Sequence, residues 1–387
     1  MNNLASNLWK IPAFKFISDF LMIAPIIIPF YKANGLSATQ ILVTQAVFSL
    51  SMLIFEVPSG YLSDVIGRRK TLIICATSYP LGIFVYAFSS SFFGFLCAET
   101  ILGFSLSMRS GTDSAILYDT LLQMDQVRSY KKYEGRAFFF ERLGTSLASV
   151  SGGLCALVSL RFTFFANAIS SLFLFPVSLS LIEPERKTRK SSNPLKDLIG
   201  IVKFSLKKRE VLGIMLFSSL LLTTGVISIW GYFLYLGTWK VPLFWYGIYF
   251  ALFQLASAYS SLLSHKVENL FGQKGSIYLL FLIPLFQLTI GFVNTPWIIP
   301  LMLLHAMLWG MATPVFLDIL NAYIESDIRA TVLSVAGMIG RITYVIIGPL
   351  FGLLIDTTSL FTAFLGLALY FVTIGVFSLR LLAHNPQ

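Results

Sequence analysis

Eleven residues between two long apolar runs read Gly60-Tyr61-Leu62-Ser63-Asp64-Val65-Ile66-Gly67-Arg68-Arg69-Lys70. Each charged side chain costs roughly 2.5–3.5 kcal/mol at the centre of a membrane helix, so an aspartate and three cations this close together cannot cross a bilayer. Gly67 adds a residue that favours a turn. We therefore predict a short loop in water that joins two membrane-spanning helices.

Composition extends this interpretation to the whole chain of 387 residues. Hydrophobic residues make up 56%, charged residues only 12%, and the mean hydropathy is +0.78. Runs of about twenty apolar residues, each long enough to cross a bilayer as a helix, recur throughout. We predict an all-α polytopic membrane protein with twelve transmembrane helices, at 12–31, 37–60, 71–89, 92–117, 137–160, 162–182, 211–236, 242–264, 275–293, 297–320, 329–355 and 359–380.

The net charge of +10 follows the predicted loops rather than one soluble face. With a cytoplasmic N-terminus, the inner loops and tails hold 21 lysines and arginines and the outer loops hold 3. Cytoplasmic loops carry such an excess of cations. We expect both termini in the cytoplasm, a multi-pass protein of the cytoplasmic (inner) membrane, and contact with lipid headgroups rather than with nucleic acid.

One long hydrophilic interruption, at 183–210, divides the chain into domains 1–182 and 211–387. The two halves look related. The segment 265–274 lies between spans eight and nine, where a repeat of the 60–70 loop belongs, and Gly272 aligns with Gly67. Small residues of the fifth and eleventh spans also match at an offset of 200. Both matches favour two parallel six-helix repeats.

The 60–70 stretch resembles the loop signature of the major facilitator superfamily, G-x-x-x-D-x-x-G-R-R/K-x, at every fixed position. The resemblance implies two pseudo-symmetric six-helix bundles, a solute path that opens alternately to each side, and a cavity lined by spans one, four, seven and ten. It also implies that Asp119 contacts Arg68 or Arg69 when the cytoplasmic side is closed, with Asp64 at the start of span eleven. The expected gating residues are Gly60, Asp64, Gly67, Arg68, Arg69 and Asp119.

Ionisable side chains inside the predicted spans are the candidates for chemistry. Left unpaired against lipid, seven of them would cost on the order of 20 kcal/mol. They must pair with one another or line a wet cavity, and either choice builds a polar interior. The seven are Asp19, Glu99, Arg109, Asp113, Glu141, Arg142 and Arg341.

Several roles remain open for these groups. Arg109 and Asp113 are four residues apart and should share a helix face, either as a neutral pair that helps the helix insert or as a switch that breaks on binding. Asp19 is a candidate for proton or cation coupling, or an internal partner of Arg142 or Arg109. Glu99 stands where drug–proton antiporters of the superfamily carry an arginine, and a buried carboxyl suits proton coupling.

The remaining candidates lie mostly in the second half. Glu141 and Arg341 occupy equivalent places at the 200-residue offset. His305 is a core packing residue or a contact for protons or solute. Asp318 and Asn321, three residues apart at the end of span ten, should face the same way.

No enzyme motif is present: the chain has no H-E-x-x-H, no G-x-S-x-G, no phosphate-binding G-x-x-x-x-G-K-[ST] and no paired cysteine spacing. The resemblance implies a transporter, and without a phosphate-binding loop we expect it to be driven by protons. We expect no cofactor or metal, a monomer, and an amphiphilic or zwitterionic small organic solute. Export of a drug or of a secreted metabolite such as a siderophore is favoured over uptake. A proton-coupled uptake permease and a transporter-like sensor without flux are the alternatives.

Overall fold

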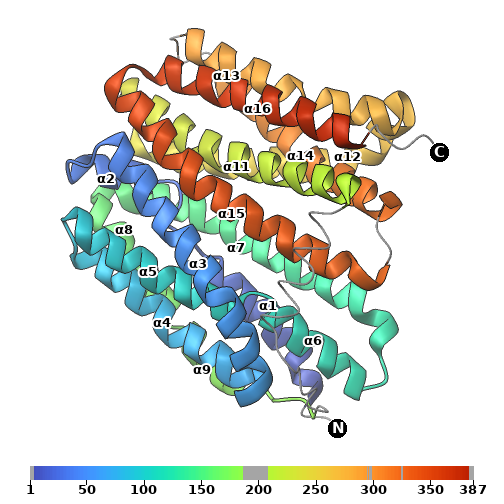
Figure 1. Cartoon of the computed structure of the whole chain (residues 1–387). Coiled ribbons are helices and arrows are strands. Elements are labelled where there is room, and N and C mark those ends of the chain that lie inside the picture. Colours follow the sequence, from blue (N-terminus) through green and yellow to red (C-terminus); the bar gives the residue numbers. More distant parts are fainter. Residues whose placement is uncertain (1–3, 186–207, 294, 296–298, 324–325, 383–387) are drawn as a thin grey trace. The chain divides into compact units, whose positions relative to one another are not determined.

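The computed structural model describes residues 4–185, 208–293, 295, 299–323 and 326–382, apart from the side chains of 273–274, 291, 313, 317–323, 326–331 and 333. Every regular element in this described part is helical, and no strand occurs in it (Figure 1). The all-α fold class predicted from the apolar runs is confirmed.

The first half of the chain forms nine α-helices, preceded and interrupted by short 3-10 turns at Leu4–Ser6 and Val127–Ser129. The second predicted span is α3, which continues to Ile66, one residue before the turn at Gly67, where φ is +108°. The helices are α1 (Asn7–Ser18), α2 (Ile27–Ala33), α3 (Ala38–Ile66), α4 (Arg68–Phe88), α5 (Phe92–Arg109), α6 (Thr112–Gln123), α7 (Tyr130–Val158), α8 (Leu160–Ser171) and α9 (Leu174–Ser180).

Three predicted spans of this half are broken. The first divides into α1 and α2, the fourth into α5 and α6, and the sixth into α8 and α9. Asn167 of α8 satisfies the backbone inside the first break, since its amide accepts from the Ile23 N–H (3.2 Å) and donates to the Phe20 carbonyl (3.3 Å). Irregular backbone at membrane depth needs such partners. At the second break Gly111 is left-handed, with φ +73°.

The second half contains α11 (Arg209–Thr238), α12 (Leu243–Leu279), α13 (Leu282–Phe292), α14 (Ile299–Tyr323), α15 (Ser326–Thr357) and α16 (Leu360–Leu382). Within α12 the chain turns at Gly272, whose φ is +69°, and the segments on either side are bent by 114°. Gly67 and Gly272 were aligned as equivalent loop positions, and both adopt a positive φ that favours glycine. The aligned loops of the two halves therefore turn in a related way.

Eight helical segments of the described residues are long and apolar enough to cross a membrane, and the bent pair Leu243–Gly272 and Gly275–Ile290 would make a ninth. The bent pair covers the predicted spans eight and nine, so ten of the twelve predicted spans are represented in this set and two are missing from it. Span one is interrupted between Ser18 and Ile27, and α7 carries charged residues, including Glu141 and Arg142, within the fifth span. Both exceptions carry charged side chains within the predicted span: Lys15 and Asp19 in the first, and Glu141 and Arg142 in the fifth.

The chain separates into two compact units. The first comprises residues 1–35, 47–194 and 242–251, and the second comprises 36–46, 195–241 and 252–387. The beginning of α3 thus packs with helices of the second half, and the beginning of α12 with helices of the first. The predicted division at 183–210 remains a prediction, and most of that linker lies outside the described residues.

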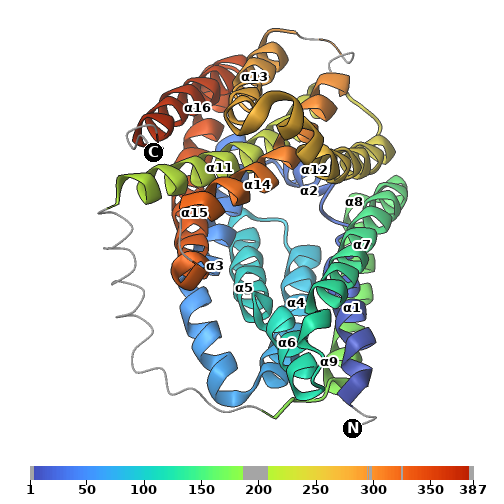
Figure 2. The same ribbon diagram turned by 90° about the vertical axis from the view of Figure 1, so that its right-hand side faces the viewer.

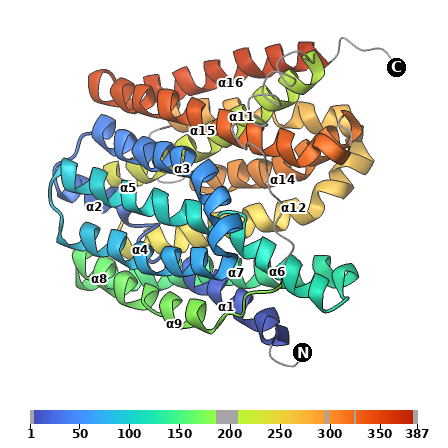
Figure 3. The ribbon, with the colours of Figure 1, turned by 60° about the horizontal axis from the view of Figure 1, so that its bottom comes forward.

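Within the first unit α4 runs beside α5, and α1 lies against α7 (Figures 1 and 3). Gly144 of α7 permits the second contact, because a Cβ there would lie 2.5 Å from the carbonyl oxygen of Phe16. Within the second unit α11 packs against both α15 and α16 (Figures 2 and 3). Apolar side chains such as Met215, Phe217, Leu280 and Phe371 fill the core between them.

Candidate functional site

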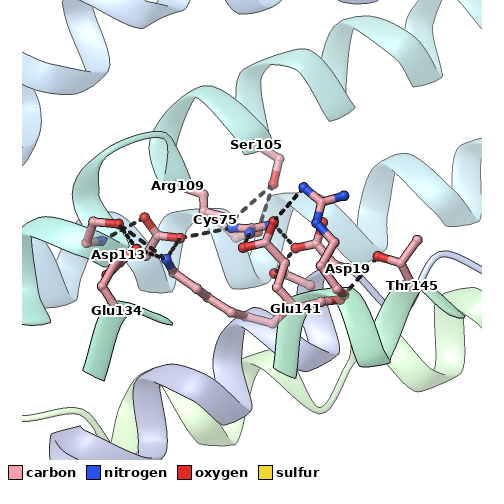
Figure 4. Close-up of polar contacts among 12 residues, drawn as sticks. Asp19, Cys75, Ser105, Arg109, Asp113, Glu134, Glu141 and Thr145 are labelled. Carbon is pink, nitrogen blue, oxygen red and sulfur yellow. Dashed lines mark hydrogen bonds and ion pairs between the residues drawn. The ribbon is translucent and has the colours of Figure 1, made fainter. Parts of the chain in front are cut away.

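Arg109, the last residue of α5, is the centre of an ionic network in the first unit (Figure 4). Its guanidinium forms ion pairs with Asp19 at the end of α1, with Asp113 of α6 (Nε–Oδ2 3.2 Å) and with Glu141 of α7 (Nη2–Oε2 3.4 Å). The arginine side chain is 13% exposed. A guanidinium has five N–H donors in a planar fork, so one arginine can serve carboxylates from three other helices.

The Arg109–Asp113 pair forms for a different reason from the one predicted. The two residues do not share a continuous helix, because α5 ends at Arg109 and α6 begins at Thr112. Left-handed Gly111 lets the chain turn between them. Arg109 lies in the last turn of one helix and Asp113 in the first turn of the next, where the helix dipoles favour a cation and an anion respectively.

Lys15 of α1 supplies a second buried cation that sequence reasoning missed. Its Nζ lies 2.6 Å from Oε1 of Glu134, 3.2 Å from Oγ of Ser114 and 3.8 Å from Oδ2 of Asp113. Lys15 lies inside the predicted first span, so its charge was a usable signal. Glu134 gave no such signal, because it precedes the predicted fifth span. The helix α7 begins earlier than that span, at Tyr130, and therefore includes Glu134.

Glu134 is only partly satisfied. Its Oε1 accepts from Lys15 and from Ser114 Oγ (2.8 Å), while its Oε2 is buried without a hydrogen-bond partner among the described residues. Tyr130 lies close by, ahead of the predicted fifth span. Its pKa is raised mainly by burial of the phenol and, to a smaller extent, by the Glu134 carboxylate. This end of the network therefore has carboxylate oxygen in excess of donors.

A cavity of about 380 Å³ adjoins the network. Its lining contains three carboxylates and two cations. Glu134, which contacts Lys15 beside the cavity, brings the network to four carboxylates and two cations. Arg142 adds a third cation at the edge, 46% exposed, with Nη2 3.6 Å from Oε1 of Glu141. If every group is ionised, the network still has a net negative charge. The lining residues are Lys15, Asp19, Met52, Leu106, Arg109, Ser110, Gly111, Asp113 and Glu141.

Glu99 lies apart from this network. It precedes Arg109 by ten residues on α5, about 15 Å along the helix axis. Its carboxylate is 3% exposed and accepts a hydrogen bond from the Tyr31 hydroxyl at 3.0 Å. That hydroxyl also contacts the hydroxyl of Tyr86, and Phe95 packs against both tyrosine rings. The coupling role predicted for Glu99 remains a prediction, and the hydrogen bond from Tyr31 places its carboxylate beside a buried tyrosine pair.

The 60–70 loop is tied to the rest of the first unit through its two arginines. Arg68 Nη1 lies 2.7 Å from Oδ2 of Asp119, and Arg69 Nη2 donates to the carbonyl of Leu179 at 2.6 Å. Asp64 is exposed near the end of α3, and Gly60 is exposed one turn earlier. The gating roles of these residues remain predictions.

Glu183 is a further partner of this loop that was not predicted. Its carboxylate oxygens accept from the backbone N–H groups of Arg68 (2.8 Å) and Arg69 (2.6 Å), so it caps the first turn of α4. A Cβ at Gly67 would lie 3.1 Å from that carboxyl group. Glu183 begins the hydrophilic linker, and nothing in its local sequence distinguishes it from the other charges there.

The second unit holds the other candidates. His305 of α14 is fully buried, neither ring nitrogen has a hydrogen-bond partner among the described residues, and its ring centre lies 5.5 Å from that of Tyr232. Arg341 is half-buried on α15. The side chain of Asp318 lies outside the described residues. The predicted equivalence of Glu141 and Arg341 is therefore not tested.

Comparison with known proteins agrees with this geometry. The family model of the Major Facilitator Superfamily matches residues 13–348, and the chain belongs to that superfamily, whose members are transporters. No curated protein sequence matches the chain.

Similar solved structures support the same fold. The nucleoside transporter NupG has a TM-score of 0.79 at 15% identity, over 98% of this chain and all of that one. A bacterial homologue of the human lysosomal transporter Spinster, in an inward-facing and unoccupied conformation, has a TM-score of 0.75 at 15% identity, over 98% of this chain and 96% of that one. At such low identity these likenesses bear on the fold and not on the solute.

Proposed function

We propose that this protein is a proton-coupled secondary transporter, which moves a small organic solute across the cytoplasmic membrane by alternating access. The observation that carries the proposal is the ionic network around Arg109: one buried arginine contacts Asp19, Asp113 and Glu141 beside a cavity. A surplus of carboxylates over cations among largely buried side chains is unfavourable unless a proton or a cationic group compensates it.

The same arrangement suggests how coupling would work. Asp19 follows the end of α1, directly before the break in the first span, and its partner Arg109 is at the break in the fourth. Protonation of Asp19 would remove one of the three carboxylates that hold Arg109. The network then has two stable arrangements, one with the proton and one with a solute ammonium group, and the two ligands compete. Competition of this kind is antiport, which favours export over uptake.

The solute class follows from the lining. Carboxylates could receive an ammonium group, while Met52 and Leu106 could contact an apolar body. We therefore favour an amphiphilic or zwitterionic organic solute over an anion. The loop residues Asp64, Arg68 and Asp119 would hold the cytoplasmic side closed in one state of the cycle, with both termini in the cytoplasm.

Purified protein in proteoliposomes tests this proposal. A pH gradient is imposed, and a panel of organic cations, zwitterions and nucleosides is screened for movement and for proton flux. Asp19→Asn should abolish proton-driven flux and keep solute counterflow, because the binding cavity remains while the titrating group is lost. Asp125→Asn is the matched control, since Asp125 is an exposed carboxyl outside the network.

The alternatives give different results. Solute that binds without any movement would indicate a sensor built on a transporter fold. Solute and protons moving in the same direction would indicate an uptake permease. Unchanged pH dependence in Asp19→Asn would remove Asp19 as the coupling group.

A further inference from the structure

Asp356, near the end of α15, binds the first turn of α3 within the second unit. Its Oδ1 accepts from the backbone N–H of Ala38 at 2.9 Å. Its Oδ2 accepts from the backbone N–H of Thr39 at 2.7 Å and from the Thr39 hydroxyl at 2.6 Å. The first N–H groups of a helix have no partner inside the helix. Asp356 therefore caps the N-terminus of α3, although the two lie more than 300 positions apart in the chain.

The backbones of α3 and α15 come together at the same place. A Cβ at Gly352, one turn before Asp356, would lie 2.7 Å from the carbonyl oxygen of Ala38 and 2.8 Å from the Cα of Thr39. One turn further back, a Cβ at Gly348 would lie 3.9 Å from Leu42. Gly352 thus lets the two backbones approach closely, and the Asp356 carboxylate forms its hydrogen bonds at the same place.

This contact joins the two sequence halves, because α3 belongs to the first half and α15 to the second. A second contact of the same kind occurs in the first unit, between the end of α7 and the beginning of α12. A Cβ at Gly153 would lie 2.8 Å from the Phe244 carbonyl oxygen, and one at Gly247 would lie 3.2 Å from the Cα of Gly153. In the orientation predicted from the loop charges, all four of these helix ends are on the outer side.

We propose that Asp356 is a gating residue that holds the outer side closed, and the inference rests on the alternating access of the proposed function. If the two halves rock against each other, the start of α3 must leave the end of α15 when the outer side opens. The three hydrogen bonds to Asp356 break in that step. Water can replace them, because Asp356 is exposed, so the contact is reversible.

The negative charge of Asp356 should stabilise this contact in addition to its hydrogen bonds. A carboxylate at a helix N-terminus is favoured by the helix dipole, and loss of a capping side chain costs about 0.5–2 kcal/mol. Loss of the cap should therefore raise the population of the outward-open state about 2- to 30-fold. This residue would not touch the solute. It would set how often the outer side opens.

Cysteine labelling tests the proposal without any solute. In a background without Cys75, Cys97 and Cys155, Leu42→Cys places a thiol at a fully buried position against α15. A membrane-impermeant maleimide should label it slowly. Asp356→Ala, which removes the cap, should raise the labelling rate about 2- to 30-fold, and Asp356→Asn, which keeps one acceptor oxygen, should raise it less. Thr39→Ala, which removes one of the three hydrogen bonds, should give a smaller rise.

Controls separate a gate from a local fold effect. Thr358→Ala should leave labelling unchanged, because the one hydrogen bond of the Thr358 hydroxyl among the described residues is to the Leu354 carbonyl, at the end of α15. Asp356→Asn should accelerate labelling with no matching fall in the unfolding temperature. Unchanged labelling rates in both Asp356→Asn and Asp356→Ala would overturn the proposal. A labelling rate that rises only as far as the unfolding temperature falls would overturn it too. If the labelling rates change as expected but the protein moves no solute in proteoliposomes, the proposed transport activity is rejected and the gating role of Asp356 is not.

Discussion

Replacing Arg109 by methionine removes the cation at the centre of the network and keeps a side chain of similar length. Three carboxylates, on Asp19, Asp113 and Glu141, would then face one another around a site where the arginine is only 13% exposed. Across about 3.3 Å, each lost attraction is about 5 kcal/mol at an effective dielectric constant of about 20, before desolvation is counted. Removal of one partner from a buried ion pair costs about 3–5 kcal/mol net.

We therefore expect Arg109→Met to lower the free energy of unfolding by about 3–5 kcal/mol at neutral pH. The loss should shrink in acid, because protonated carboxyls no longer repel one another. The measurement is reversible unfolding in mixed detergent micelles at several pH values. Arg128→Met is the matched control, since Arg128 is exposed and should change the stability by less than about 0.5 kcal/mol.

A double-mutant cycle sharpens the test. If Arg109 and Asp113 interact as the 3.2 Å distance indicates, Arg109→Met and Asp113→Asn together should cost less than the sum of the two. A loss below about 1 kcal/mol in Arg109→Met, independent of pH and with additive effects, would refute the reasoning that this network is a buried, coupled unit.

Three further predictions concern residues outside that network. Glu183→Ala should lower stability by about 0.5–2 kcal/mol in thermal unfolding, because the side-chain cap on α4 is lost; an unchanged melting temperature would exclude a capping role. His305→Leu should leave stability unchanged or higher, since an imidazole without hydrogen-bond partners among the described residues is replaced by an apolar side chain of similar volume; a large loss would show that the imidazole is satisfied in the folded state. Asp64→Asn should impair proteoliposome flux more than folding, because the 60–70 loop is expected to act as a gate, and equal losses would defeat that expectation.

Hydropathy predicted the positions of most helices because a membrane span needs about twenty apolar residues in a row. Gly67 and Gly272 were identified as related turns from two short loops, and both have positive φ values. The breaks near Asp19 and at Gly111 were not predicted, because one aspartate or one glycine does not interrupt an apolar run.

The site was predicted as a set of charges but not as a set of pairs. Asp19, Arg109, Asp113 and Glu141 were selected because charge inside a span needs a partner, and the structure brings all four together. The partners could not be assigned, because Lys15 and Glu134 are 119 positions apart and Glu183 and Arg68 are 115 apart. Asp356 lies just past the predicted eleventh span, where a carboxylate needs no special explanation. Its role becomes visible only through the distant first turn of α3.

The central claim is that the surplus carboxylates beside Arg109 hold an exchangeable proton, and infrared difference spectroscopy tests it most directly. Spectra of the purified protein are compared between mildly acidic and mildly alkaline pH in the region of the protonated carboxyl C=O stretch. We predict a titrating carboxyl band that Asp125→Asn retains and that Asp19→Asn or Glu141→Gln loses. A spectrum without a titrating band in the unaltered protein, or a band that survives both of those substitutions, would contradict the account.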